Sequence, residues 1–226
     1  MARVEHLALS TGTPAVLARP DGTPSRGLIL WPDIFGNRPL FDDHAARIAD
    51  DHGWVVCVVE PFPGREDLPL DQRFAAMPHL DDADKLADLE AAIDACGVDA
   101  VGVMGFCMGG MYAMKSLASP RIDRAVAFYG MIRVPPDWDG AGQGDAIDVV
   151  ATRPSDLLGV FGTEDPWCPN DQVAELEALG AHLAVYPGAD HGWAQDPGRD
   201  NYREVDAPDA WRRAEAFLAD GTLDPT

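Results

Sequence analysis

The chain has 226 residues, of which 46% are hydrophobic and 24% charged, and its formal net charge is −21 at pH 7. This length suits one domain, residues 1–226, that buries about 70% or more of its unfolded surface. The acidic balance excludes nucleic acid as a partner, because phosphates require a basic face. The sequence contains no apolar run of 18 residues and no N-terminal signal, so we expect no membrane association and a cytoplasmic location.

Strand and helix patterns alternate along the chain. Strands are expected at residues 4–9, 15–18, 28–31, 54–59, 100–104, 124–128, 157–161 and 182–186. Helical periodicity separates most of them, at residues 41–51, 82–96, 171–179 and 208–219. The first two strands form an N-terminal pair, and the later alternation predicts an α/β fold with a mostly parallel sheet covered by helices on both faces.

The strand at 100–104 leads into Gly105-Phe106-Cys107-Met108-Gly109, and a helical pattern follows. This order is typical of a nucleophile elbow, with cysteine in place of the more common serine. The glycines allow a tight turn, and the free N–H groups at the helix start favour a thiolate at Cys107 and a developing oxyanion. A buried structural cysteine among packing glycines is the alternative.

Residues 131–155 carry no long helical pattern, and residues 135–144 read as an irregular loop. A loop of this length in a compact domain is usually functional or disordered. We expect a lid over the active site, with Trp138 in contact with the substrate. A surface insertion without such a role is the alternative.

A cysteine on an elbow requires an acid and a histidine, which arrive in that order on later loops. The strand at 157–161 is followed by Asp165, with the adjacent Glu164 as the alternative acid. The strand at 182–186 is followed by His191, the one histidine on a late strand-exit loop with a glycine beside it. The sequence therefore predicts a triad of Cys107, His191 and Asp165.

The other cysteines, Cys57, Cys96 and Cys168, show no zinc-type spacing, and we expect no structural disulfide. Cys57 and Cys96 lie in or beside apolar segments, where inert buried thiols are common. Cys168 follows Asp165 closely and is interpreted as a packing residue, with oxidation to Cys107 as the alternative.

Four segments together resemble the dienelactone hydrolase family: residues 31–36, residues 105–110, the Asp165 loop and residues 188–192. The resemblance spans about residues 28–211. It implies a single α/β-hydrolase domain that cleaves enol-lactones or activated esters through an acyl-cysteine, without metal or organic cofactor. It also implies an oxyanion hole made by the N–H groups of Ile34 and Met108. The family's early-loop acid, which interacts with the resting thiol, is Asp33 here, where glutamate is usual.

The resemblance further implies arginines that bind a substrate carboxylate. Arg73 matches the first of them, and Gln195 stands where the second is expected. A glutamine can hydrogen-bond a carboxylate but cannot neutralise it, so Arg199 and Arg203 are the alternatives from the following loop. The expected substrate-binding residues are Phe35, Arg73, Trp138 and Gln195.

The expected partner is a small-molecule lactone or ester, and the expected assembly is a monomer or weak homo-oligomer. A thiolate expels a stabilised enolate more readily than an amine or alkoxide, which favours enol-lactones and activated esters. Two alternatives stay open. One is a general carboxylesterase or thioesterase, which the glutamine at 195 favours; the other is a non-catalytic binding protein that kept the fold.

Overall fold

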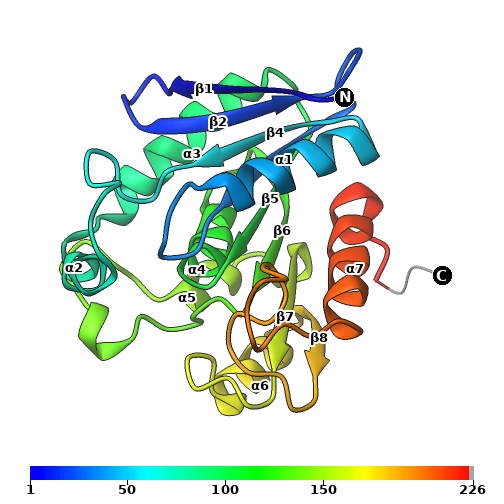
Figure 1. Ribbon diagram of the computed structural model, residues 1–226. Coiled ribbons are helices and arrows are strands. Elements are labelled where there is room, and N and C mark those ends of the chain that lie inside the picture. The colour runs from blue at the N-terminus through cyan, green and yellow to red at the C-terminus, as the bar shows by residue number, and fades with distance from the viewer. Residues whose placement is uncertain (224–226) are drawn as a thin grey trace.

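The computed structural model describes residues 1–223. Eight strands form one sheet in the order β1-β2-β4-β3-β5-β6-β7-β8 (Figure 1). β1 pairs antiparallel with β2, β2 pairs antiparallel with β4, and the other neighbours are parallel. The strands are β1 (Arg3–Ala8), β2 (Pro14–Arg19), β3 (Arg26–Trp31), β4 (Trp54–Val59), β5 (Val101–Phe106), β6 (Ile122–Phe128), β7 (Leu157–Gly162) and β8 (His182–Tyr186).

All eight strands expected from the sequence are present, within a few residues at their ends. Every residue of β3, β4, β5 and β7 is buried. Parallel strands covered on both faces read as continuous apolar runs rather than as alternating patterns. This burial explains why the central strands could be recognised from apolar runs alone.

Helices cover both faces of the sheet. They are α1 (Pro39–His52), α2 (Leu70–Ala76), α3 (Asp82–Cys96), α4 (Met108–Lys115), α5 (Ala146–Val150), α6 (Asn170–Leu179) and α7 (Asp206–Asp220). Figure 1 shows α1 in front of the sheet and α3 behind it. The Arg47–Glu215 ion pair, 2.5 Å long, joins α1 to α7, and the 2.8 Å Lys115–Asp82 pair joins α4 to α3.

Two helices, α2 and α5, were not expected, because seven and five residues are too few to show a helical period. With α5, the segment 131–155 contains a 3₁₀ turn at Pro136–Trp138. The segment is also tied together internally, since the Ile147 N–H donates to the Ile132 carbonyl at 3.1 Å. The expected irregular loop is therefore a folded segment.

The strand order places the site. The chain adds β4 on one side of β3 and then returns to add β5 on the other side. Ligands of open α/β sheets bind at such a switch point, beyond the carboxyl ends of the strands. Trp31 of β3 is paired in register with Gly105 of β5. The loop after β3 and the turn after β5 therefore emerge side by side.

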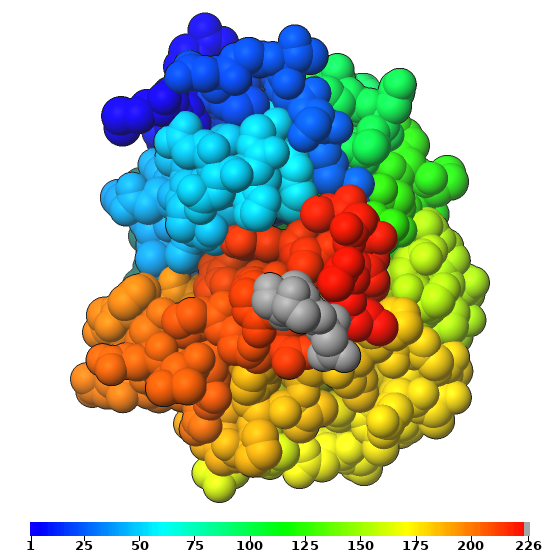
Figure 2. All heavy atoms as spheres, turned by 90° about the vertical axis from the view of Figure 1, so that its right-hand side faces the viewer, coloured from blue at the N-terminus to red at the C-terminus, as the bar shows by residue number. Residues whose placement is uncertain are grey.

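A view turned by 90° shows α7 crossing the middle of one face (Figure 2). The loop between β8 and α7, coloured orange, bulges beside it and carries His191. Within residues 1–223, no helix combines the length and the apolar character needed to cross a membrane.

Candidate active site

Cys107 occupies the turn between β5 and α4, with φ 57° and ψ −123°. Such a backbone is costly for any residue other than glycine, and strained residues of this kind gather at functional sites. Two hydrogen bonds fix the turn: the Cys107 N–H donates to the Phe128 carbonyl at 3.0 Å, and the Met111 N–H donates to the Cys107 carbonyl at 3.1 Å. The side chain is partly exposed, as a nucleophile on an elbow requires.

The glycines of the elbow are required by close backbone contacts. A Cβ atom at Gly105 would lie 2.0 Å from the Gly109 carbonyl oxygen. A Cβ atom at Gly109 would lie 2.2 Å from the carbonyl oxygens of Trp31 and Pro32. The turn after β5 therefore packs directly against the loop after β3.

Gly109→Ala is expected to lower the free energy of unfolding by about 3 kcal/mol, because backbone atoms must move to admit the methyl group. Thermal or urea unfolding measures this loss. Gly144→Ala is the matched control, since its Cβ would meet only one Asp82 oxygen, at 4.0 Å. Equal stability of the two variants would show that the close contact at Gly109 is not limiting.

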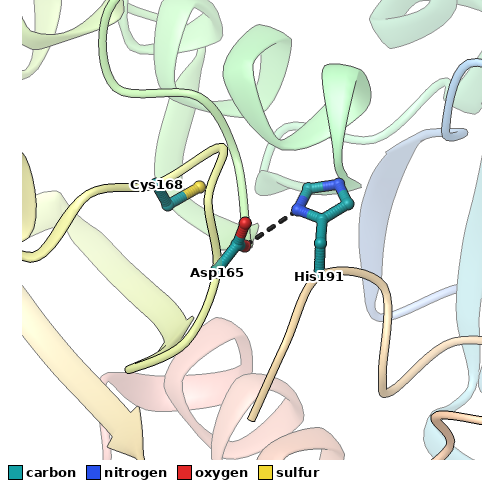
Figure 3. A group of neighbouring side chains, drawn as sticks. All are labelled: Asp165, Cys168 and His191. Carbon is teal, nitrogen blue, oxygen red and sulfur yellow. Dashed lines mark hydrogen bonds and ion pairs between the residues drawn. The ribbon is translucent and has the colours of Figure 1, made fainter.

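His191 and Asp165 form a hydrogen-bonded pair beside the elbow (Figure 3). His191 Nδ1 lies 2.8 Å from Asp165 Oδ2, and because a carboxylate only accepts, Nδ1 carries the proton. Asp165 Oδ1 accepts from the Trp167 N–H at 2.8 Å, so both carboxylate oxygens are held. Glu164, the alternative acid, has an exposed side chain. The geometry therefore selects Asp165 as the partner of His191.

His191 Nε2 is buried and makes no hydrogen bond within residues 1–223. Burial lowers the pKa of His191, but its electrostatic interaction with Cys107 and its hydrogen bond with Asp165 outweigh this effect. The pKa of His191 is therefore raised well above its ordinary value. A cationic imidazole beside the sulfur favours an imidazolium and thiolate pair.

Cys168 lies next to Asp165 in Figure 3 but is bound elsewhere. Its thiol donates to the Gly130 carbonyl at 3.3 Å. Burial raises its pKa to about 12, so the thiol is neutral. The ligand atoms of Asp165, Cys168 and His191 lie within 4.8 Å of one another. A metal bound there would require ionisation of Cys168 and loss of the existing hydrogen bonds.

Two backbone N–H groups are candidate oxyanion donors: Met108 directly follows Cys107, and Ile34 lines the same cavity as Cys107. The Met108 N–H is at the first turn of α4, where no intrahelical partner exists. The Ile34 N–H belongs to the turn after β3, which is closed by the Gly36 N–H donating to the Asp33 carbonyl at 2.9 Å. Free donors beside a nucleophile are the components of an oxyanion hole.

A cavity of about 170 Å³ joins these groups. Cys107, His191 and the Asp33–Phe35 loop all line it. Three aromatic side chains, Phe74, Trp138 and Trp167, complete much of the wall. Trp138 and Trp167 pack with their ring centroids 5.4 Å apart. Only Trp138 of these three was expected from the sequence; Trp167 could have been noticed as a neighbour of the acid.

The expected substrate-binding residues behave differently from one another. Phe35 is 41% exposed and lines the cavity, as does the buried Trp138. Arg73 does not line it: its guanidinium donates to the Leu68 carbonyl at 2.9 Å, the Ile34 carbonyl at 3.3 Å and the Glu66 carbonyl. The Arg73 side chain thus fastens the backbone of neighbouring loops.

Gln195 also lines the cavity, but its amide is already bound. Its Nε2 donates to Asp33 Oδ2 at 3.1 Å, and its Oε1 accepts from the Tyr129 hydroxyl. Arg199 faces the same cavity and is exposed. Arg203, the other alternative, donates to the carbonyls of Pro187 and Gly188 instead.

Asp33 forms an ion pair with Arg38, which was not among the site residues predicted from the sequence. Arg38 binds both oxygens of its carboxylate, at 2.7 and 2.9 Å. The two residues are five positions apart in one loop, which was a detectable though weak signal. Asp33 is 2% exposed, so this ion pair is part of the interior of the site.

Comparison with known proteins identifies the family to which the chain belongs. A model of the dienelactone hydrolase family matches residues 13–221. The chain belongs to the dienelactone hydrolase family. It is 30% identical over 220 residues to a Bradyrhizobium protein named a probable 2-oxo-3-(5-oxofuran-2-ylidene)propanoate lactonase, covering 90% of this chain and 88% of that protein. It is 27% identical over 201 residues to carboxymethylenebutenolidase 2 of Cupriavidus pinatubonensis, covering 84% and 79%.

Solved structures show the same fold. The chain superimposes on a candidate dienelactone hydrolase from Klebsiella pneumoniae with a TM-score of 0.83 and 24% identity, covering 97% of this chain and 99% of that one. The expected α/β-hydrolase fold is thus confirmed. Membership of the dienelactone hydrolase family shows that the protein is a hydrolase.

Proposed function

We propose that this dienelactone hydrolase family member opens enol-lactones, and cleaves activated esters, through a thioester on Cys107. The observation that carries the proposal is the convergence of three groups on one cavity. These are a strained cysteine at a helix start, a His191–Asp165 pair, and two candidate N–H donors, of Ile34 in the cavity wall and of Met108 next to Cys107. Nucleophile, base with orienting acid, and oxyanion donors are the parts required for acyl transfer.

The reaction begins with the thiolate of Cys107 attacking the carbonyl carbon, while the carbonyl oxygen becomes an oxyanion held by two N–H groups. The carbon–oxygen bond of the lactone then breaks, and the enolate oxygen takes a proton from His191. His191 next removes a proton from water, and the hydroxide attacks the thioester. Collapse releases the carboxylic acid and restores the thiolate. Asp165 keeps the proton on Nδ1 and stabilises the imidazolium throughout.

The cavity supports a flat, unsaturated substrate. Its walls include Phe74, Trp138 and Trp167, whose faces suit a planar lactone ring. The Bradyrhizobium relative is named as a lactonase whose substrate, a propanoate, carries a carboxylate. The Cupriavidus relative is named carboxymethylenebutenolidase 2. Arg199 is the group in the cavity with which a substrate carboxylate would pair, because the one hydrogen bond of its guanidinium within residues 1–223 is a long one, 3.4 Å, to the Gly192 carbonyl.

Incubation of the protein with dienelactone tests the proposal. We expect loss of the lactone's ultraviolet absorbance and, after acid quenching, a mass adduct on the peptide that contains Cys107. Absence of turnover by the parent protein would refute the assignment. A general esterase is the second candidate, because much of the cavity wall is apolar. It would hydrolyse p-nitrophenyl acetate with a higher kcat/KM than dienelactone.

Arg199→Gln is expected to raise KM for dienelactone about tenfold, the effect of losing one charge-assisted contact. The KM for p-nitrophenyl acetate, which has no carboxylate, should not change. Arg65→Gln removes the same charge from an exposed side chain outside this cavity and serves as the control. A parental KM for dienelactone in Arg199→Gln would remove Arg199 from substrate recognition.

A further inference from the structure

The Asp33 carboxylate lies in the wall of the active-site cavity and is saturated with hydrogen bonds. We propose that Arg38 is a positioning residue that sets the ionisation of Cys107 by holding Asp33 as a fixed, charge-balanced carboxylate. This inference rests on the proposed function, since it concerns the nucleophile of that reaction. It assigns a role to Arg38, whose side chain does not line the cavity.

Arg38 grips Asp33 from the start of α1. Its two terminal nitrogens lie 2.7 Å from Oδ1 and 2.9 Å from Oδ2, a two-pronged contact that fixes the orientation of the carboxylate. The guanidinium also lies over two aromatic rings, 4.8 Å from the Phe41 centroid and 5.5 Å from the Phe35 centroid. These contacts leave Arg38 with little freedom to move, because both its charge and its flat faces are engaged.

The same carboxylate shapes the loop that carries an oxyanion donor. Asp33 Oδ1 accepts from the Phe35 N–H at 3.0 Å, and Arg38 donates to the Gly36 carbonyl at 3.3 Å. Ile34 lies between Asp33 and Phe35, the two residues that the first of these hydrogen bonds joins. Arg38 therefore helps to fix the direction of the Ile34 N–H through Asp33.

Gln195 occupies the remaining position on Asp33. Its Nε2 donates to Oδ2 at 3.1 Å, while its Oε1 accepts from the Tyr129 hydroxyl. Burial, followed by the charge of Asp33, raises the pKa of Tyr129 well above its ordinary value, so its hydroxyl remains a donor. Asp33 thus accepts four hydrogen bonds, the full capacity of a carboxylate. No lone pair is left to take the proton of the Cys107 thiol.

Several other charged or titratable groups surround this pair. They are His191 with Asp165 behind it, Cys168, Tyr129, Arg199 and, behind the loop at Gly36, Glu60 and Arg73. Substitution of Arg38 or Asp33 removes none of these groups. The charge of the Asp33–Arg38 pair is therefore the quantity that the variants change.

The sign of the effect follows from the net charge of the pair, which is zero in the parent. Arg38→Gln leaves the negative charge of Asp33 without its counter-charge, and a nearby negative charge disfavours a thiolate. Asp33→Asn leaves one positive charge, which favours it. The double variant Asp33→Asn with Arg38→Gln is neutral again.

Alkylation of Cys107 by iodoacetamide between pH 5 and 9, followed by mass spectrometry, measures the ionisation directly. We expect the midpoint of the rate profile to rise by about one pH unit in Arg38→Gln and to fall by a similar amount in Asp33→Asn. The double variant should return to the parental midpoint. Arg38→Lys keeps the positive charge, so its midpoint should lie close to the parental value. The other three thiols are buried and will react slowly.

Arg47→Gln is the matched control, because Arg47 lies on the same helix but pairs with Asp51 and Glu215. It should keep the parental profile. A role of Arg38 in stability alone would lower the melting temperature without this order of midpoints, and that result would overturn the proposal. A double variant that stays as shifted as Arg38→Gln would also overturn it. Alkylation requires no substrate, so failure to hydrolyse dienelactone would leave this test intact.

Discussion

Cys107→Ala is expected to abolish hydrolysis of dienelactone, with kcat reduced by about 10⁴ or more, because no other side chain forms the covalent intermediate. The fold should survive. Cys107 is partly exposed, and alanine is smaller, so the substitution adds no atoms to the packed turn. Activity is measured at saturating dienelactone, and near-ultraviolet circular dichroism and the melting temperature report the fold.

Cys107→Ser separates nucleophilicity from geometry in the same position. A serine hydroxyl stays protonated at neutral pH and is a much weaker nucleophile than a thiolate, so it must lose its proton during the attack itself. We therefore expect Cys107→Ser to retain less than about a hundredth of the parental kcat. Residual activity of Cys107→Ala above that level would mean that another nucleophile, such as Cys168 or Ser116, carries the reaction.

Much of the site could be predicted because each catalytic residue has a local sequence signal. Cys107 directly follows β5, and Asp165 and His191 lie in the loops that leave β7 and β8; β5 and β7 are buried along their whole length. Parallel strands deliver their carboxyl ends to one edge of the sheet. A residue defined by its position after a strand is therefore placed in space as soon as the strands are known.

Residues whose role depends on contacts across loops could not be predicted in this way. Gln195 was expected to meet the substrate, but its amide is bound between Asp33 and Tyr129, which come from two other loops. Arg73 was expected to face a substrate carboxylate, but three backbone carbonyls accept from it. Loop side chains choose among many partners, and the sequence does not show which partner lies within reach.

His191→Ala and Asp165→Ala are expected to differ in severity. His191 transfers protons in both half-reactions, so its loss should lower kcat by about 10⁴. Asp165 orients the imidazole through the 2.8 Å hydrogen bond and stabilises its charge. Its loss should cost about 10²–10³ in kcat, since the imidazole itself remains. The double variant should be no slower than His191→Ala, because the two residues act as one unit.

The pH profile distinguishes orientation from general damage. The hydrogen bond with Asp165 raises the pKa of His191, so Asp165→Ala should lower that pKa. The imidazolium would then be lost at a lower pH, and the basic limb of kcat/KM should move down. Glu164→Gln is the matched control, because it removes the adjacent exposed carboxylate and should change neither rate nor profile. Near-parental kcat in His191→Ala would exclude His191 as the base, and an unmoved basic limb in Asp165→Ala would exclude Asp165 as its partner.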